Sequence, residues 1–270
     1  MVKPIVIFTG ALHPEKAVFE RFMHDFDTPG FVIAADSGLL CAEEFGYTPD
    51  LIVGDMDSLT DKSLLSAYPE DKILIFERDK AESDTVLALE KAFAKRLELE
   101  ARGSELLPRN SGLSVQTRKN VPASVQLHGS GSAAEGAGGH NMPIILCGGD
   151  GGRIDHLLGI VKQFERVFFP DIWLCREQAV YSLRPASDGK GAILKFAAER
   201  CAEHMSVFPV PVKDGEYKIY SEGLEWPLDN LDWKNEAFSL SNRVRADYLA
   251  HKKRVVLRAE KGAFIAIVPY

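Results

Sequence analysis

The sequence predicts an α/β domain with a mainly parallel sheet flanked by helices, followed by an all-β sandwich domain. From the first residues onward, short β-branched runs alternate with amphipathic stretches, as in βαβ units. Nearer the C-terminus, short strand-like runs follow one another with Gly, Pro, Asn and Asp between them. The 270 residues are 46% hydrophobic, which suits one large domain or two modest ones. We therefore expect domains at 1–182 and 183–270.

The first half of the chain contains the elements of a parallel sheet. The expected strands are 4–8, 31–36, 50–55 and 71–77, and the expected helices between them are 14–26 and 38–46. Apolar runs of this length, separated by helices, indicate strands that are buried on both faces. Ligands of such sheets bind at the carboxyl ends of the strands, where the loops emerge.

A longer helix is expected at 83–100, with Ser83 as its N-cap and apolar residues on one face. The segment that follows, about 100–141, is rich in Gly, Ser, Ala and Asn and has little periodicity. Because a strand pattern resumes at 143–152, we interpret this segment as a flexible insertion in the first domain. A domain boundary at the same place is the alternative.

The rest of the chain is expected to contain one more helix and then strands. The helix is 153–168, and the strand-like runs are 171–177, 191–198, 204–210, 215–222, 253–260 and 262–270. No long helix interrupts the later runs, which favours an antiparallel sandwich or barrel.

Composition excludes several classes of protein. A net charge of -7 gives no general attraction to nucleic acid or anionic membranes, and the locally basic stretch 243–258 suits a solvated strand face. The four cysteines have no CxxC pair or zinc-ligand spacing, so we expect reduced thiols in the core. No apolar run approaches the ~18 residues of a membrane span, and no signal peptide is evident. We expect a cytoplasmic protein.

Two aspartates stand two residues apart behind a predicted strand, in "LIVGDMDSLT" (51–60). If the chain stays extended there, Asp55 and Asp57 project to the same side and bring two like charges together. A hard divalent cation such as Mg²⁺ takes oxygen ligands and keeps part of its coordination for substrate phosphates. The alternative is an Asx-turn in which Asp57 caps Ser58 and Leu59, and this stretch alone leaves both open.

Two further aspartates are expected at the same edge of the sheet. Asp36 follows the second predicted strand, and Asp84 begins the helix after the fourth. An acid at a helix start is usually a cap or a partner of the helix dipole, so Asp84 alone is weak evidence. Four aspartates at consecutive loops are hard to explain by capping alone, which favours the metal site.

A glycine-rich segment, "CGGDGGRIDHLLG" (147–159), lies between a predicted strand and a predicted helix. Its glycines let backbone N–H groups approach an anion, and the forked guanidinium group of Arg153 suits phosphate oxygens. The segment has neither Walker A nor GxGxxG spacing, so the glycines alone also fit a tight turn. With Arg153, Asp155 and His156 it indicates a polyphosphate or substrate site, although His156 also suits a local capping or packing role.

Taken together, the motifs resemble those of one known family. In chain order they are AADSG (34–38), TPDLIVGDMDSL (48–59), KAESDTVLALEKA (80–92), GGDGGRIDH (148–156), GLEWPL (223–228) and SLSN (239–242). They resemble the motifs of thiamine pyrophosphokinases, and the resemblance spans nearly the whole chain apart from 100–141. GDxDS together with GGxGGRxDH is specific, whereas either motif alone is not.

The resemblance implies that ATP donates an intact pyrophosphoryl group to the thiamine hydroxyl, giving thiamine diphosphate and AMP with Mg²⁺. It also implies a homodimer in which thiamine binds between the subunits. By position, the metal-binding and catalytic residues are Asp55, Asp57 and Asp84. Those of the nucleotide site are Asp36, Gly151, Gly152 and Arg153. Those of the thiamine end are Asp155, Ser239, Ser241 and Asn242.

The chain departs from the family pattern at several positions. Ala81 stands where a second acid is usual, with Glu82 beside it, and Ser37 and Gly159 replace a usual glycine and asparagine. Some members place an aromatic residue after SxSN, and Tyr248 is the nearest candidate. Two alternatives follow: a related Mg²⁺-dependent pyrophosphokinase or phosphohydrolase acting on another substrate, and a non-catalytic thiamine- or nucleotide-binding homologue.

Overall fold

The computed structural model describes residues 2–59, 61–77, 82–105, 142–185, 191–201, 203–211, 215–235 and 237–270. Its strands are β1 (Ile5–Thr9), β2 (Phe31–Ala35), β3 (Leu51–Gly54), β4 (Ile73–Ile75), β5 (Ile144–Cys147), β6 (Ile172–Leu174), β7 (Gln178–Leu183), β8 (Ala192–Ala197), β9 (Met205–Val210), β10 (Lys218–Glu222), β11 (Ser239–Asn242), β12 (Arg254–Lys261) and β13 (Ala263–Pro269). Its α-helices are α1 (Lys16–Met23), α2 (Gly38–Glu44), α3 (Asp84–Glu105), α4 (Ile154–Gln163) and α5 (Ala246–Ala250). Short 3₁₀ turns occur at 62–67, 70–72, 198–201, 228–230 and 233–235.

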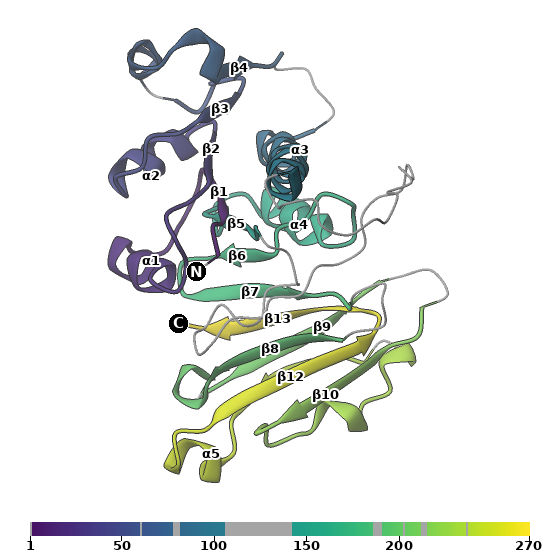
Figure 1. Ribbon diagram of the computed structural model, residues 1–270. Coiled ribbons are helices and arrows are strands. Elements are labelled where there is room, and N and C mark those ends of the chain that lie inside the picture. The colour runs from purple at the N-terminus through teal and green to yellow at the C-terminus, as the bar shows by residue number, and fades with distance from the viewer. Residues whose placement is uncertain are drawn as a thin grey trace.

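The strands form a ten-stranded sheet in the order β11-β9-β13-β7-β6-β5-β1-β2-β3-β4. Its half from β6 to β4 is parallel throughout. Figure 1 shows α1 and α2 on one face of this half and α3 and α4 on the other. The prediction of a mainly parallel sheet flanked by helices is therefore confirmed. The expected helix 153–168 ends earlier, at Gln163.

The C-terminal half is rich in antiparallel strands, also as predicted. β7 pairs antiparallel with β6, so the same sheet continues through β13, β9 and β11. β10, β12 and β8 form a second, three-stranded sheet that is layered against these strands in Figure 1. The sandwich thus shares its larger sheet with the α/β part, and β7 runs across the boundary expected at residue 182.

The parallel strands are buried on both faces, which explains their continuous apolar sequences. In β1, Val6 and Phe8 point into the core beneath α1 and α2. Ile5 and Ile7 alternate with them and point into the core beneath α3 and α4. Successive residues of a strand face opposite sides, so each face needs its own apolar set. Both cores hold the carboxyl ends of β1, β2 and β3 in fixed relative positions.

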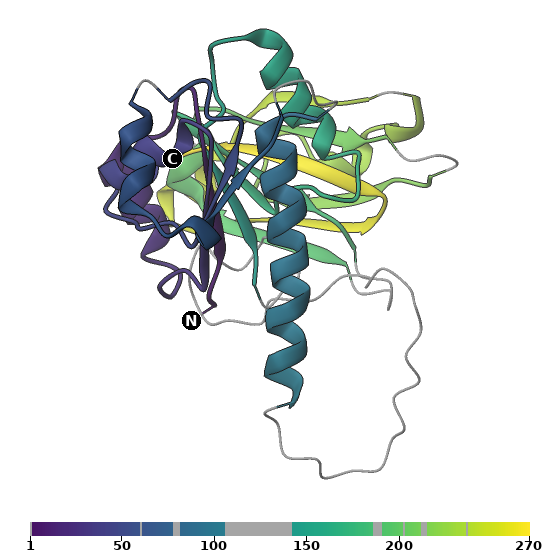
Figure 2. The same ribbon diagram turned by 90° about the horizontal axis from the view of Figure 1, so that it is seen from above.

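A buried ion pair anchors α3 to the sheet. The Arg96 guanidinium on α3 donates to Asp171, just before β6, at 2.9 Å, and the same carboxylate accepts from the Ile144 amide at 2.8 Å. Both charged side chains are almost fully buried, with 4% and 1% of their surface exposed. The start of α3 then lies at the carboxyl edge of the sheet, and its C-terminal turns project beyond the strands (Figure 2).

The insertion expected at about 100–141 falls mostly outside the described residues. Its first residues belong to α3, which continues to Glu105. Among the parts of the chain that the structure describes, no helix combines the length and the apolarity that crossing a bilayer requires.

Candidate active site

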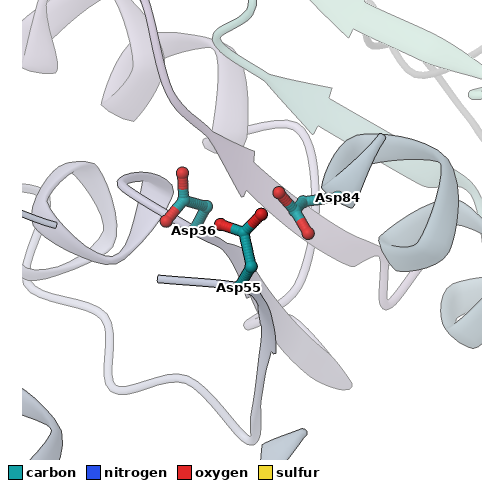
Figure 3. Close-up of side chains that lie close together, drawn as sticks. All are labelled: Asp36, Asp55 and Asp84. Atoms are coloured by element: carbon teal, nitrogen blue, oxygen red, sulfur yellow. The ribbon is translucent and has the colours of Figure 1, made fainter. Parts of the chain in front are cut away.

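Three aspartates from separate elements converge at the carboxyl edge of the parallel sheet. Asp36 follows β2, Asp55 follows β3, and Asp84 is the first residue of α3. Each offers a carboxylate oxygen, and these oxygens lie within 4.8 Å of one another. Figure 3 shows the three side chains pointing toward one another. The sequence predicted this meeting because the ends of neighbouring parallel strands share one edge.

Local backbone geometry brings Asp36 and Asp55 together. Gly54 has a φ of +147°, which residues with a side chain rarely adopt, and a Cβ there would be in tight contact with the Asp36 Cβ, at 3.2 Å. Asp36 and Met56 both have left-handed backbones, with φ values of 48° and 58°. Such conformations are costly for residues other than glycine and concentrate at functional sites. The strained backbone at these residues orients the carboxylates of Asp36 and Asp55 toward each other.

Asp57 is placed differently from its neighbour. Because Met56 is left-handed, residues 55–57 are not extended, and Asp57 is absent from the group of three convergent carboxylates. Its backbone amide donates to an Asp55 carboxylate oxygen at 3.0 Å, and its own carboxylate accepts from the Ser58 hydroxyl at 3.2 Å. The stretch therefore contains a turn of the Asx type, but Asp55 is the residue whose side chain makes it.

Asp36 is the buried member of the group. Only 8% of its surface is exposed, and its Oδ1 atom is buried with no hydrogen-bond partner. Burial raises the pKa of Asp36, and the nearby carboxylates of Asp84 and Asp57 raise it further, whereas the Ser58 hydroxyl lowers it. A buried oxygen without a partner, facing two other carboxylates, fits a hard cation that takes oxygen ligands. These residues are thus a suitable donor set for Mg²⁺.

The raised pKa of Asp36 predicts how stability depends on pH without divalent cations. The folded chain binds a proton on Asp36 more tightly than the unfolded chain does. Protonation of Asp36 therefore stabilises the fold fully below the ordinary pKa of 3.8, and this stabilisation is lost as the pH rises through the higher pKa of the folded state. Asp36→Asn should flatten this part of the dependence, and the exposed control Asp71→Asn should not. Melting midpoints measured in EDTA from acidic to neutral pH test this. Parallel curves for wild type and Asp36→Asn would contradict it.

The glycine-rich loop after β5 is tied to the loop after β1. A Cβ at Gly148 would lie 2.4 Å from the Thr9 carbonyl oxygen, so this position requires glycine. The Gly149 amide donates to the Gly10 carbonyl at 2.8 Å, and Leu12 and Asp150 form an isolated antiparallel bridge. This is where the strand order reverses, with β2 on one side of β1 and β5 on the other. Open α/β sheets bind ligands at such a point.

Gly151 and Gly152 end the loop with left-handed backbones, at φ values of 69° and 70°. β5 and β2 are two strand positions apart, about 10 Å at the usual strand spacing. The loop and the carboxylates are therefore separated by a distance that suits a polyphosphate chain.

Arg153 and Asp155 are paired with each other at the start of α4. The guanidinium donates twice to the carboxylate, at 3.1 and 2.6 Å, and both side chains are exposed. The hydrogen bond with Arg153 lowers the pKa of Asp155. An exposed ion pair of this kind contributes little to the stability of the fold, so an anionic ligand can replace Asp155 as the hydrogen-bond partner of the guanidinium. His156, which follows, is exposed on the helix.

Three of the four residues assigned to the thiamine end, Ser239, Ser241 and Asn242, lie on β11 at the opposite edge of the sheet, whereas Asp155 lies on α4. The Asn242 side chain is buried and makes four hydrogen bonds. It donates to the Trp226 carbonyl at 2.7 Å and the Ser239 hydroxyl at 3.1 Å, and it accepts from the Trp226 amide at 3.3 Å. Ser241 is exposed and has a left-handed backbone. Asn242 thus holds both the backbone amide and the backbone carbonyl of Trp226.

Asn242→Ala is expected to lower the free energy of unfolding by about 1 to 3 kcal/mol, because it removes a buried side chain that bonds three part-buried backbone groups and the Ser239 hydroxyl. Urea unfolding of Asn242→Ala beside Asn230→Ala, an exposed control, measures the difference. Equal free energies of unfolding for the two variants would mean that water replaces the hydrogen bonds of Asn242 without loss of stability.

Comparison with known proteins agrees with these geometric features. The family described as "Thiamin pyrophosphokinase, catalytic domain" matches residues 23–175, which is more than half of the chain. The chain belongs to the thiamin pyrophosphokinase family. That match contains the three convergent aspartates and the glycine-rich loop. No curated protein sequence matches the chain significantly.

Solved structures from the thiamin pyrophosphokinase family share the fold at low sequence identity. Thiamine pyrophosphokinase from Bacillus subtilis is 18% identical, with a TM-score of 0.59 over 99% of each chain. The yeast enzyme is 14% identical, with a TM-score of 0.59 over 99% of this chain and 86% of its own. The enzyme from Candida albicans is 12% identical, with the same TM-score over 99% of this chain and 89% of its own.

The structure points to an exposed aromatic residue, Trp226, that the sequence reasoning did not single out. Tyr248 packs against the core, and its ring lies so close to Gly223 that a Cβ there would come within 2.4 Å. Trp226 instead has 53% of its surface exposed, with its backbone fixed by Asn242. Its position inside the GLEWPL motif was the available signal. Trp226 is therefore the better placed of the two for contact with a ligand ring.

Two departures from the family pattern have different outcomes. Ala81 lies outside the described residues. A Cβ added at Gly159 would meet no atom within 4 Å, so this helix position faces open space. The missing side chain at 159 thus leaves the packing of α4 unchanged.

Proposed function

We propose that the chain is a thiamine pyrophosphokinase, which transfers the pyrophosphoryl group of ATP to the hydroxyl of thiamine. The observation that carries the proposal is the convergence of Asp36, Asp55 and Asp84 beside the glycine-rich loop, in a chain of this family. A polyphosphate substrate needs neutralisation of its charge and in-line placement of the attacking hydroxyl, more than it needs a strong base.

Asp36, Asp55 and Asp84 are the residues proposed to hold Mg²⁺. The bound ion would neutralise charge on the polyphosphate oxygens. Asp57 adds negative charge beside Asp36 and contacts Asp55 through its amide. In this proposal Asp57 shapes the turn and the electrostatics of the site, whereas the sequence reasoning had counted it among the ligands.

The glycine loop and Arg153 are proposed to bind phosphate oxygens. The amides of Gly151 and Gly152 lie at the start of α4, where a helix favours negative charge. Two of the five N–H donors of Arg153 are on Asp155, and we propose that a phosphate taking this same side of the guanidinium exchanges with that carboxylate. The released Asp155 carboxylate is then free to accept from a group of thiamine.

The reaction forms one bond and breaks one bond. The thiamine hydroxyl oxygen attacks the β-phosphorus of ATP, and the bond from that phosphorus to the oxygen of the α-phosphate breaks. AMP leaves with that oxygen, and the hydroxyl proton passes to an aspartate carboxylate of the group. Thiamine diphosphate is the second product.

A second copy of the chain is proposed to complete the site. β3, which precedes Asp55, and β11 are eight strand positions apart in one sheet, roughly 40 Å at the usual spacing before twist. Group transfer requires the reacting atoms to lie within about 3.5 Å. Thiamine bound at Trp226 would therefore react with ATP on another chain of a homodimer. The exposed Ile154 and Leu158 on α4 offer an apolar face for such a contact.

Product analysis tests the proposal and its alternatives. Purified protein incubated with ATP, Mg²⁺ and thiamine is expected to release AMP and thiamine diphosphate in equal amounts. AMP or phosphate released equally without thiamine would indicate a phosphohydrolase, and AMP released only with another hydroxylated heterocycle would indicate a related pyrophosphokinase. Binding of thiamine or ATP without any AMP would indicate a non-catalytic homologue. Each of these three results would overturn the proposal.

A further inference from the structure

Thr9, the last residue of β1, links the sheet to the first turn of α3. Its hydroxyl lies 2.8 Å from the hydroxyl of Thr85, the second residue of α3, and either oxygen can donate. Only 6% of the Thr9 surface is exposed, whereas Thr85 is half-buried, so the hydrogen bond is partly shielded from water. Thr85 directly follows Asp84, one of the three convergent carboxylates (Figure 3).

Thr9 also contacts the glycine-rich loop. A Cβ at Gly148 would lie 2.4 Å from the Thr9 carbonyl oxygen, and one at Gly149 would lie 3.2 Å from the Thr9 Cγ2 methyl group. The residue therefore sits between the loop proposed to bind phosphate and the helix that carries Asp84. Its hydroxyl faces the helix and its methyl group faces the loop, so the two contacts can be separated by substitution.

The first turn of α3 lies ahead of the fully buried part of the helix. The fully buried side chains of the helix begin at Ala88 and Leu89, one turn after Asp84. Ahead of them, Ser83 accepts from the Val86 amide, which caps the helix locally but does not tie it to the sheet. The position of Asp84 relative to the strand ends thus depends on how firmly this turn is held.

We propose that Thr9 is a positioning residue that acts through Thr85 to hold Asp84 beside Asp36 and Asp55, where the three carboxylates receive a divalent cation. The inference rests on the proposed function in that it takes these aspartates as the cation site. Without the hydrogen bond, the turn is freer, and part of the free energy of cation binding is spent on ordering it.

Four variants separate this role from simple packing. Thr9→Val removes the hydroxyl and keeps nearly the same volume, whereas Thr9→Ser keeps the hydroxyl and removes the methyl group. Thr85→Val removes the partner, and the double variant Thr9→Val/Thr85→Val completes a mutant cycle. Mn²⁺ binding to each folded protein, followed by electron paramagnetic resonance without nucleotide, reads the cation site directly. Melting temperatures confirm that each variant is folded.

Thr9→Val and Thr85→Val are each expected to weaken Mn²⁺ binding by about two- to tenfold, the effect of one hydrogen bond on an equilibrium. Thr9→Ser should bind like wild type, and the double variant should bind no more weakly than either single variant. Three results would overturn the inference: wild-type affinity in Thr9→Val, an equal loss in Thr9→Ser, or no Mn²⁺ binding by the wild type. If the variants follow the expected pattern but the wild type makes no thiamine diphosphate, the proposed function fails and the positioning role stands.

Discussion

Replacing Asp84 by asparagine is expected to lower pyrophosphoryl transfer by about a hundred- to a thousandfold, the usual effect of losing one group that stabilises transition-state charge. The fold should survive, because Asp84 is a half-buried residue at the start of α3, ahead of the fully buried part of the helix. Removing one of three neighbouring carboxylates also relieves repulsion, so the melting temperature without divalent cations should stay the same or rise. Steady-state rates and thermal melts of the purified variant measure both effects.

Matched aspartate variants decide whether the effect belongs to the convergent group. Asp55→Asn should resemble Asp84→Asn, because both carboxylates reach the same point. Asp57→Asn should cost less, because its carboxylate lies outside that group, and the remote Asp71→Asn should cost nothing. If Asp57→Asn were as inactive as Asp55→Asn while Asp84→Asn stayed active, the cation would be held by the 55–57 turn instead.

Mixing two inactive variants is expected to restore activity. If each site combines the aspartates of one chain with the β11 edge of another, a dimer of Asp84→Asn and Trp226→Ala chains has one site with both halves intact. Random mixing makes half of the dimers mixed, so about a quarter of the wild-type activity should return. Trp226→Ala suits this purpose because the Trp226 side chain is exposed. Removing it leaves the hydrogen bonds between Asn242 and the backbone of residue 226 in place.

Co-expression of differently tagged chains, followed by tandem purification, isolates the mixed dimers for assay. The double variant, with both substitutions in one chain, is the control and should stay inactive in any mixture. Mixed dimers with no more activity than either parent would contradict a site shared between chains. Recovery of only monomers would contradict the dimer itself.

The parallel half of the fold was predictable because its signals are local. Each strand is a short apolar run, each helix between strands is amphipathic, and the rule for strand ends placed Asp36 and Asp55 at one edge. Asp84 followed from the start of a clear helix. These residues meet in the structure because the order of strands in a parallel sheet brings their carboxyl ends together.

Other features depend on contacts that no local pattern contains. The left-handed backbone of Met56, which turns Asp57 away from an extended path, belongs to a residue type that rarely adopts it. The antiparallel pairing of β7 with β13, which continues one sheet into the C-terminal half, joins segments that are distant in sequence and whose pairing is not encoded by their periodicity. The hydrogen bonds that hold the Trp226 backbone come from the side chain of Asn242, which is distant in sequence.

A crystal structure with Mg²⁺, a non-hydrolysable ATP analogue and thiamine tests the central claim most directly. We expect the ion between Asp36, Asp55 and Asp84, the phosphates against Gly151, Gly152 and Arg153, and thiamine against Trp226 of a second copy of the chain. An ion bound elsewhere, or thiamine bound within one chain and away from Trp226, would contradict the account.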